Sequence, residues 1–241
     1  MEDESAPSLE LKFDPELDLT TGITLDFNAN DLPRYIAIEG SIGVGKTTLA
    51  KNLGRLFNYD TLLEQPQDNP FLERFYQDTR ATALPTQLFF LFQRVKQLQA
   101  LRQGDMFEPV RVADFLIEKD PLFAQTTLDD DELRLYHQVY NQLTIDAPKP
   151  DLVIYLQAPT DILLQRIQQR GVSFEQNIDP NYLNALNEAY TQFFHYYDAA
   201  PLLIVNVTEL DLASNSSHFQ NLVEYILTIK RGRHYYNPSP L

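Results

Sequence analysis

Residues 40–47 combine glycines with a lysine and a threonine in an order that suits phosphate binding. The segment, Gly40-Ser-Ile-Gly-Val-Gly-Lys-Thr47, fits the pattern G-x-x-x-x-G-K-[ST]. Glycines let the backbone bend around phosphate oxygens and point its N–H groups at them, while Lys46 reaches the β- and γ-phosphates of ATP. Thr47 offers a hydroxyl to Mg²⁺, which takes most of its other ligands from phosphate and water. The candidate ATP-binding residues are Gly40, Ser41, Ile42, Gly43, Val44, Gly45, Lys46, Thr47 and Thr48.

The sequence on either side supports this interpretation. An apolar run at Tyr35–Glu39 predicts a buried strand before the glycines, and the spacing over Thr48–Phe57 predicts a helix after them. A glycine-rich loop between a strand and a helix is the context that the motif requires. Nucleotide binding is therefore the strongest functional indication in the sequence.

Four more charged residues suit phosphoryl transfer. Glu64 ends the second predicted strand and could accept the proton of an attacking hydroxyl, and Asp114 ends the third and could bind Mg²⁺. Arg166 and Arg170 lie four residues apart on a predicted helix, so both can reach one polyphosphate when that segment closes as a lid. The alternative for these arginines is a solvated helix face with salt bridges.

The composition restricts the class of protein. The chain has 241 residues, 44% of them hydrophobic, which is enough for one domain with a substantial core. A net charge of −15 disfavours binding to DNA, RNA or anionic membrane surfaces. The absence of cysteine excludes disulfides, thiol nucleophiles and cysteine-ligated metals. Without a secretion signal or a run of about 18 apolar residues, the protein is expected to be soluble and cytoplasmic.

Short apolar runs alternate with helical patterns, as in a doubly wound α/β domain. We predict a P-loop NTPase-type three-layer α/β/α domain with a five-stranded parallel sheet. Polar residues follow most of the strands, at the edge where open α/β sheets place their sites. The predicted strands are Tyr35–Glu39, Thr61–Glu64, Val110–Asp114, Leu152–Leu156 and Leu202–Val207.

These patterns divide the chain into three predicted segments. Residues 1–33 hold nine acidic residues against one lysine and are predicted to form a mobile arm, part of which could lie along the domain or a partner subunit. Residues 34–232 form the predicted kinase-like domain. Residues 233–241 are predicted to be a C-terminal tail that either orders on a partner or frays.

A long helix is predicted over Leu84–Leu101, with Pro85 in its first turn. Its apolar face is wider than one sheet contact needs, so the helix either forms a homodimer interface or lies wholly in the core. The acidic run at residues 129–132 is predicted to supply carboxylates to the first turn of a helix.

The order of these motifs resembles that of the deoxyribonucleoside kinases, above all bacterial deoxyadenosine/deoxyguanosine kinases. The resemblance implies ATP-dependent phosphorylation of the 5′-hydroxyl of a deoxyribonucleoside, for nucleotide salvage. Glu64 in Leu-Leu-Glu-Gln-Pro resembles the catalytic carboxylate of the family, and Tyr76 the tyrosine that approaches the sugar 3′-hydroxyl. Arg166-Ile-Gln-Gln-Arg170 and Glu175 resemble the lid and its sugar-binding glutamate.

The resemblance also implies a site for the base. Gln87 corresponds to a glutamine that bonds the base, and Arg94, two helical turns later, to a residue that reads it further. An amide both donates and accepts, and Phe90 offers a nearby aromatic face. Arg94 and Asp120 would form a charged pair with donors and an acceptor for a purine.

Two positions depart from the family pattern. Phe115 follows Asp114 where an arginine is usual, and Val172 stands where the lid often carries another arginine. Arg74 or Arg111 could compensate for the first. Loss of one transition-state cation costs about 2–4 kcal/mol if nothing replaces it, which would reduce turnover.

Two alternatives remain open. A nucleoside-monophosphate kinase would need added cations for the acceptor phosphate, and residues 60–100 offer only Arg74, Arg80, Arg94 and Lys96. A nucleotide-binding regulatory subunit with weak or no catalysis is the other, and the missing arginine motivates it.

Overall fold

The computed structural model describes residues 19–20, 32–103, 111–143 and 147–238, with only the backbone at 101–103. The strands are β1 (Tyr35–Gly40), β2 (Asp60–Leu62), β3 (Arg111–Ala113), β4 (Leu152–Gln157), β5 (Leu202–Asn206) and β6 (Arg233–Tyr236). The α-helices are α1 (Lys46–Phe57), α2 (Leu72–Gln77), α3 (Thr79–Gln103), α4 (Asp120–Thr127), α5 (Asp130–Leu143), α6 (Thr160–Arg170), α7 (Pro180–Tyr196) and α8 (Ser216–Thr228). Three short 3₁₀ helices are η2 (Pro66–Asp68), η3 (Ile117–Lys119) and η4 (Ser173–Asn177).

The strands form one parallel sheet in the order β2-β3-β1-β4-β5-β6. The predicted α/β class and parallel sheet are confirmed, but the count of five strands is wrong. The sixth strand, β6, pairs with β5 through residues that the sequence assigned to a tail. Its exposure alternates, with Tyr235 64% exposed, as is typical of an edge strand. The sequence did not predict it because such a strand has no continuous apolar run.

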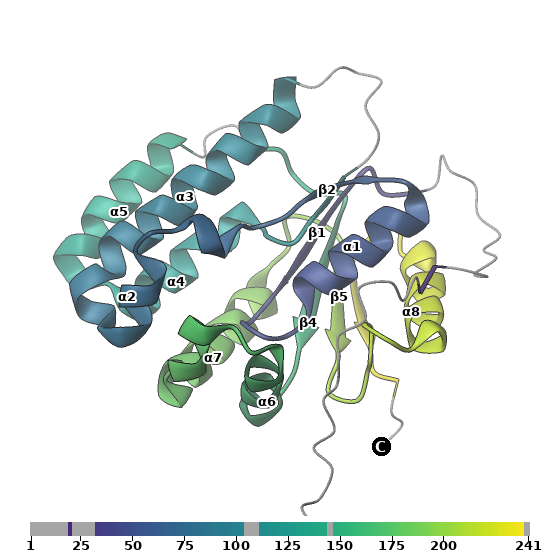
Figure 1. Ribbon diagram of the computed structural model, residues 1–241. Helices are drawn as coiled ribbons and strands as arrows, with labels where there is room; N and C mark the ends of the chain where they lie inside the picture. Colours follow the sequence, from purple (N-terminus) through teal and green to yellow (C-terminus); the bar gives the residue numbers. More distant parts are fainter. Residues whose placement is uncertain (1–18, 21–31, 104–110, 144–146, 239–241) are drawn as a thin grey trace, which may run out of the picture.

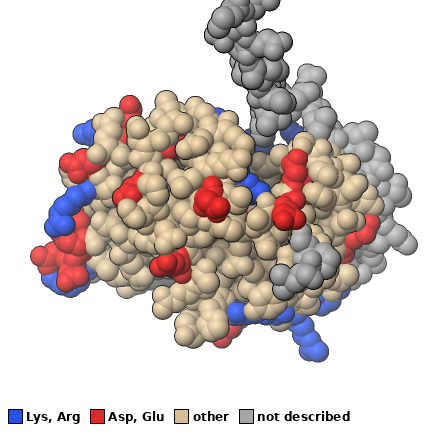
Figure 2. Space-filling model, turned by 90° about the horizontal axis from the view of Figure 1, so that it is seen from below, with Lys and Arg blue, Asp and Glu red and all other residues tan. Residues whose placement is uncertain are grey.

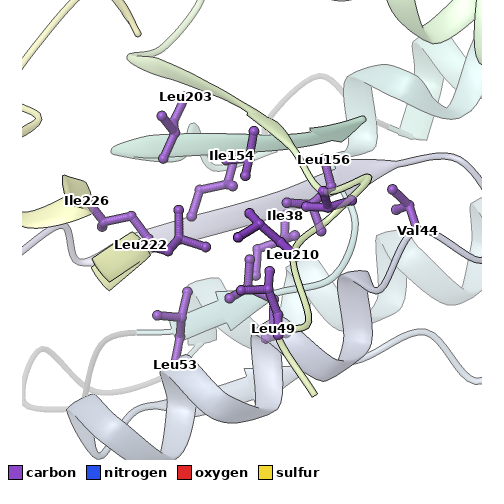
Figure 3. Packing of buried hydrophobic residues seen from close by; sticks show 14 of the residues in the cluster. Ile38, Val44, Leu49, Leu53, Ile154, Leu156, Leu203, Leu210, Leu222 and Ile226 are labelled. Carbon is purple, nitrogen blue, oxygen red and sulfur yellow. The ribbon is translucent and has the colours of Figure 1, made fainter. Parts of the chain in front are cut away.

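One face of the sheet is covered by α1 and α8 (Figure 1). Leu49 and Leu53 of α1, together with Leu222 of α8, pack on inward-facing residues of β1 and β4 such as Ile38 and Ile154 (Figure 3). This cluster also includes Leu19 and Leu32, so part of the acidic N-terminal segment lies against the domain. The rest of that segment lies outside the described residues.

The other face is covered by α4 and α7 next to β1, β4 and β5, and by α3 and α5 beyond β3. Leu186, Tyr190 and Phe194 of α7 pack on Tyr155 of β4. The helices α2, α3, α4 and α5 form a group to one side of the sheet, while α6 lies near the loop between β1 and α1 (Figure 1). The candidate site lies between this group of helices and the loop that joins β1 to α1.

The long helix α3 begins at Thr79, five residues before the predicted start. Pro85 is therefore not in the first turn, as predicted, but in the second. Thr82 and Thr86 beside it donate their hydroxyls to carbonyls four residues back. Among apolar residues of the helix, Leu91 is fully buried and Phe92 is 53% exposed, so its apolar face does not lie wholly in the core of one chain. At the start of α5, Asp130, Asp131 and Glu132 occupy the first turn, as the acidic run predicted.

Candidate functional site

The loop between β1 and α1 has the backbone that phosphate binding needs. Gly40, Gly43 and Gly45 all have positive φ, which side chains rarely tolerate. A Cβ at Gly40 would lie 2.4 Å from the carbonyl oxygen of Leu156, and one at Gly43 would lie 2.8 Å from the side chain of Ile167. The glycines therefore also let the loop pack closely against β4 and α6.

Lys46 and Thr47 begin α1 at the end of this loop. The Lys46 ammonium donates to the carbonyls of Gly40 (2.8 Å) and Ser41 (3.2 Å), so it lies across the loop where phosphates would sit. Burial, and next the charge of Lys119, lower the pKa of Lys46. A half-buried cation whose hydrogen bonds are to carbonyls has charge to offer an anionic ligand.

Asp114 connects two parts of the site. Its Oδ2 accepts the hydroxyl of Thr47 at 2.5 Å, and its Oδ1 accepts the backbone N–H of Glu64 at 2.8 Å. Burial, followed by the charge of Glu64, raises the pKa of Asp114 to about 6. The carboxylate of Asp114 thus holds Thr47, at the start of α1, and Glu64, two residues after β2, in fixed positions relative to each other.

Glu64 lies between cations. Its Oε1 accepts Arg94 Nε at 2.6 Å and lies 3.6 Å from the ammonium of Lys119. Burial raises the pKa of Glu64, but the charges of Arg94, Lys119 and Lys46 outweigh that effect and lower it to about 2. The carboxylate is therefore ionised at neutral pH, as a group that accepts a proton must be.

Side chains of the helix α3 donate hydrogen bonds to Glu64 and to the residues on either side of it. Gln97 donates to the carbonyl of Leu63 at 3.0 Å, Arg94 binds Glu64 itself, and Gln93 donates to the carbonyl of Gln65 at 3.4 Å. These donors lie on one side of the helix because Gln97 follows Arg94 by three residues and Gln93 by four. A rigid helix thereby fixes a residue that follows a short edge strand.

The predicted base-reading residues lie together on α3 and α4. Arg94 NH1 lies 2.9 Å from Oδ1 of Asp120, and its guanidinium lies over the ring of Phe90 at 5.2 Å. Gln87 is buried and donates to the hydroxyl of Thr127 at 3.4 Å. The sequence predicted the Arg94–Asp120 pair but missed that the same guanidinium holds Glu64.

The residues predicted to touch the sugar converge as well. Tyr76 of α2 stacks on Phe174 of η4 with 6.1 Å between ring centroids. Glu175, on η4, forms an ion pair with Arg170 of α6. Burial, and next the charge of Glu175, raise the pKa of Tyr76, which keeps its hydroxyl available as a donor.

The two lid arginines contact different groups. Arg166 donates to the carbonyls of Val207 (2.6 Å) and Leu210 (3.5 Å), beyond β5, whereas Arg170 is paired with Glu175. Arg166 also lies 3.5 Å from the carbonyl of Val44 in the phosphate loop. Among the described residues the two arginines thus share no partner, and Arg166 is the one that contacts the phosphate loop.

The position of the missing arginine is filled by packing. Phe115 is fully buried in the apolar cluster that α3, α4 and α5 form beside β3. Arg74 is exposed and lies over Phe71, and Arg111 begins β3, at the opposite end of that strand from Asp114. Of the cations in the described residues, Arg94 and Lys119 form the ion pairs of Glu64. Lys119 was missed because a single lysine between Glu118 and Asp120 carries no spacing signal that sets it apart from an ordinary surface charge.

The residues present fit a magnesium ion bound together with ATP. Thr47 and Asp114 offer a hydroxyl and a carboxylate oxygen 2.5 Å apart beside the phosphate loop. The described residues hold no group of three or more His, Cys, Asp or Glu that could bind a metal. Such a donor set suits an ion that draws its remaining oxygens from phosphates and water.

Seen from below the view of Figure 1, the described Lys and Arg side chains form separate small groups among acidic ones, with no continuous basic stripe on this face (Figure 2). In the part of the chain that the structure describes, no helix has the length and apolar character needed to cross a membrane.

Comparison with known proteins adds an independent finding. The family model described as deoxynucleoside kinase matches residues 36–230. A deoxyguanosine kinase of Bacillus subtilis is 37% identical over 201 residues, covering 80% of this chain and 95% of the relative. A deoxyadenosine/deoxycytidine kinase of the same organism is 29% identical over 203 residues, with 80% and 92% covered.

Solved structures give the same result. A deoxyadenosine kinase from M. mycoides with bound dATP superposes with a TM-score of 0.70 at 27% identity, covering 80% of this chain and 98% of that one. The structure of the same enzyme with bound dCTP gives a TM-score of 0.67 at the same identity and coverage.

Proposed function

The chain belongs to the deoxynucleoside kinase family and phosphorylates deoxyribonucleosides, and we propose that it transfers the γ-phosphoryl group of ATP to the 5′-hydroxyl of a purine deoxyribonucleoside. In the proposed reaction the 5′-oxygen forms a bond to the γ-phosphorus, the bond from that phosphorus to the β–γ bridging oxygen breaks, and ADP leaves. The proton of the hydroxyl passes to Glu64.

The bridging carboxylate of Asp114 is the observation that carries this proposal. It binds the hydroxyl of Thr47 on the ATP side and the backbone of Glu64 on the acceptor side. Phosphoryl transfer depends mainly on positioning and charge stabilisation, so a rigid link between donor and acceptor sites is what the reaction needs.

Each charged group has a proposed part. Lys46, Arg166 and Arg170 stabilise charge on the transferring group, and Glu64 accepts the proton through Oε2, since Oε1 is held by Arg94. Thr47 and Asp114 hold Mg²⁺, which neutralises charge on the β- and γ-phosphate oxygens when it is bound with ATP.

The base preference follows from the cluster on α3 and α4. Arg94 and Asp120 offer donors and an acceptor, Gln87 offers an amide, and Phe90 offers an aromatic face. The relatives are named for deoxyguanosine, deoxyadenosine and deoxycytidine. We propose a purine, and Tyr76 with Glu175 as the groups that bind the sugar.

A homodimer is part of the proposal. Phe92 of α3 is 53% exposed and Leu135 of α5 is 47% exposed, on helices that pack side by side. Large apolar side chains on neighbouring helices favour a partner surface. The proposed contact lies near residues 84–101, and the cytoplasmic location stays a prediction.

The ion pairs disfavour a nucleoside-monophosphate kinase. Arg94 is committed to Glu64 and Asp120, while Arg74, Arg80 and Lys96 are exposed. An acceptor phosphate beside Glu64 would therefore lie next to a negative carboxylate, and Arg94 nearby is already in ion pairs with Glu64 and Asp120.

The test is an ATP–Mg²⁺ phosphorylation assay across the four deoxyribonucleosides and their monophosphates, with Lys46→Ala as the inactive control. We expect turnover of deoxyadenosine or deoxyguanosine above that of the pyrimidines. Turnover of a monophosphate alone would favour the monophosphate kinase. ATP binding without transfer to any acceptor would favour the regulatory subunit.

A further inference from the structure

Lys119 is a buried lysine that the reaction described above does not use. Its side chain is 1% exposed, its ammonium lies 3.0 Å from Oε1 of Glu39 and 3.4 Å from the hydroxyl of Tyr190, and it stands over the ring of Phe123 at 4.9 Å. Lysine is almost never fully buried unless it is paired, because removing an ammonium from water is costly. These contacts fix the ammonium in one place.

The partner carboxylate, Glu39, belongs to β1 and directly precedes the phosphate loop. Its Oε2 accepts the N–H of Gly40 (3.0 Å) and the hydroxyl of Tyr190 (2.8 Å). Its Oε1 accepts the N–H of Leu116, just beyond β3, at 2.7 Å. The Lys119–Glu39 pair is therefore anchored to the first glycine of the loop and to two other elements.

The free side of the Lys119 ammonium faces Glu64, at 3.6 Å from Oε1. Arg94 Nε donates to this same oxygen at 2.6 Å. Two cations thus draw one oxygen of the carboxylate toward the interior, and Oε2 takes neither contact. That is the orientation in which Oε2 can receive a proton from an acceptor hydroxyl.

The two cations differ in what else they do. Arg94 also pairs with Asp120 and lies over Phe90, among the residues assigned to the base. Lys119 forms its ion pairs with Glu39 and Glu64, and its ammonium also contacts the hydroxyl of Tyr190. Arg94 therefore links Glu64 to the residues assigned to the base, whereas Lys119 links Glu64 to Glu39 at the end of β1.

We propose that Lys119 is a positioning residue for Glu64: with Glu39 it ties the catalytic carboxylate to the start of the phosphate loop and supplies the fixed cation that Phe115 cannot. The proposal rests on the proposed function, because it takes Glu64 as the proton acceptor. It predicts that replacing Lys119 slows the chemical step, and that this effect disappears when Glu64 is absent.

The experiment compares Lys119→Met with Lys51→Met, an exposed lysine of α1, as the matched control. Each is made in the wild-type enzyme and in Glu64→Gln, and kcat and KM are measured with saturating ATP–Mg²⁺. In the wild-type background we expect Lys119→Met to lower kcat about 10- to 100-fold with KM within about threefold. In Glu64→Gln the further loss should be less than about threefold, because the group on which Lys119 acts is gone. Lys119→Arg should restore part of kcat.

Lys119→Met leaves Glu39 buried without its cation and can impair folding, so Glu39→Gln/Lys119→Met is measured alongside it. This pair removes both charges together, and it should show the same loss of kcat and the same dependence on Glu64. Folded fraction is checked by circular dichroism and thermal melting for every variant.

The outcomes separate the two proposals. An equal loss from Lys119→Met in both backgrounds, or wild-type kcat in a folded Lys119 variant, overturns the positioning role and leaves the proposed function intact. Wild-type kcat in Glu64→Gln overturns the assignment of Glu64 as proton acceptor, and the role of Lys119 with it.

Discussion

The two sides of the site are held in different ways. On the acceptor side, the side chains of Glu64, Arg94, Asp120 and Lys119 are 15%, 4%, 0% and 1% exposed and pair with one another. On the lid side, Arg170 is 47% exposed and pairs with one glutamate, and Arg166 is bound to backbone carbonyls. One set of charges is locked in place and the other is held by contacts that solvent weakens.

The difference indicates how the enzyme divides its work. The acceptor side is held by ion pairs within the protein itself, so the position of Glu64 costs nothing at the moment of reaction. The lid arginines contact Glu175 and the backbone carbonyls of Val207 and Leu210, and in these contacts the Arg170 side chain is half exposed and Arg166 meets only neutral groups. We therefore expect the acceptor side to govern stability and catalysis together, and the lid side to govern mainly catalysis.

Arg94→Leu should produce the largest change in stability. It leaves two carboxylates, Glu64 and Asp120, without their shared guanidinium, and breaking a buried pair costs about 3–5 kcal/mol. Urea unfolding monitored by circular dichroism measures the change. A loss under about 1 kcal/mol would mean that the buried cluster contributes no more than a surface pair.

Asp114→Asn tests the link between the two sides. The substitution keeps the shape but removes the charge and opposes an amide N–H₂ to the Glu64 N–H or the Thr47 hydroxyl. We expect kcat/KM to fall about 10²–10³-fold, by analogy with loss of one charge-stabilising group. The Mg²⁺ concentration for half-maximal rate should rise. An unchanged Mg²⁺ dependence would remove Asp114 from the metal site.

Arg170→Ala tests the lid side. Its charge stabilises the transferring group in the proposed reaction, so we expect kcat to fall about 100-fold. Stability should fall by less than in Arg94→Leu, because the side chain of Arg170 is 47% exposed, although that of Glu175 is only 9% exposed and loses its partner. Arg134→Ala, which removes an arginine–carboxylate pair exposed on both sides, is the control and should leave both kcat and stability unchanged. A large loss of stability in Arg170→Ala would erase the contrast between the two sides.

Asp211→Asn should give the smallest effect and depend on pH. Burial raises the pKa of Asp211, but hydrogen bonds from Ser214 and Ala213 outweigh it and lower the pKa below its usual range. A depressed pKa stabilises the fold above the unfolded value of about 3.9 and loses that contribution as pH falls through the folded value. The variant should lose at most about 1 kcal/mol at pH 7, and the difference should narrow below about pH 4. An effect that is the same at pH 7 and pH 3.5 would contradict this.

The sequence predicted the sheet and the phosphate loop because both depend on local patterns. Continuous apolar runs mark buried parallel strands such as β4, and the glycines of the loop have a fixed spacing before Lys46. It missed β6, since an edge strand with alternating exposure lacks such a run. It set Pro85 in the wrong turn because helix ends are weakly encoded.

The sequence named the candidate site residues one by one but not the contacts between them. The strand ends pointed to Glu64 and Asp114, and the family resemblance pointed to Arg94, yet neither shows that Arg94 holds Glu64 or that Asp114 spans Thr47 and Glu64. These contacts join residues 30 to 67 positions apart and arise only when α3 packs beside the sheet. Lys119 is the clearest case, because its role depends wholly on its partners.

Comparison of Glu64→Gln with the wild-type enzyme tests the central claim most directly. The measurement is kcat for deoxyadenosine and deoxyguanosine, with the Kd of ATP–Mg²⁺ determined on the same samples. The account predicts that kcat falls about 10²–10⁴-fold, because the proton acceptor is lost, while the Kd stays within about threefold. A Glu64→Gln enzyme that keeps its kcat, or one that loses its affinity for ATP along with it, would contradict the account.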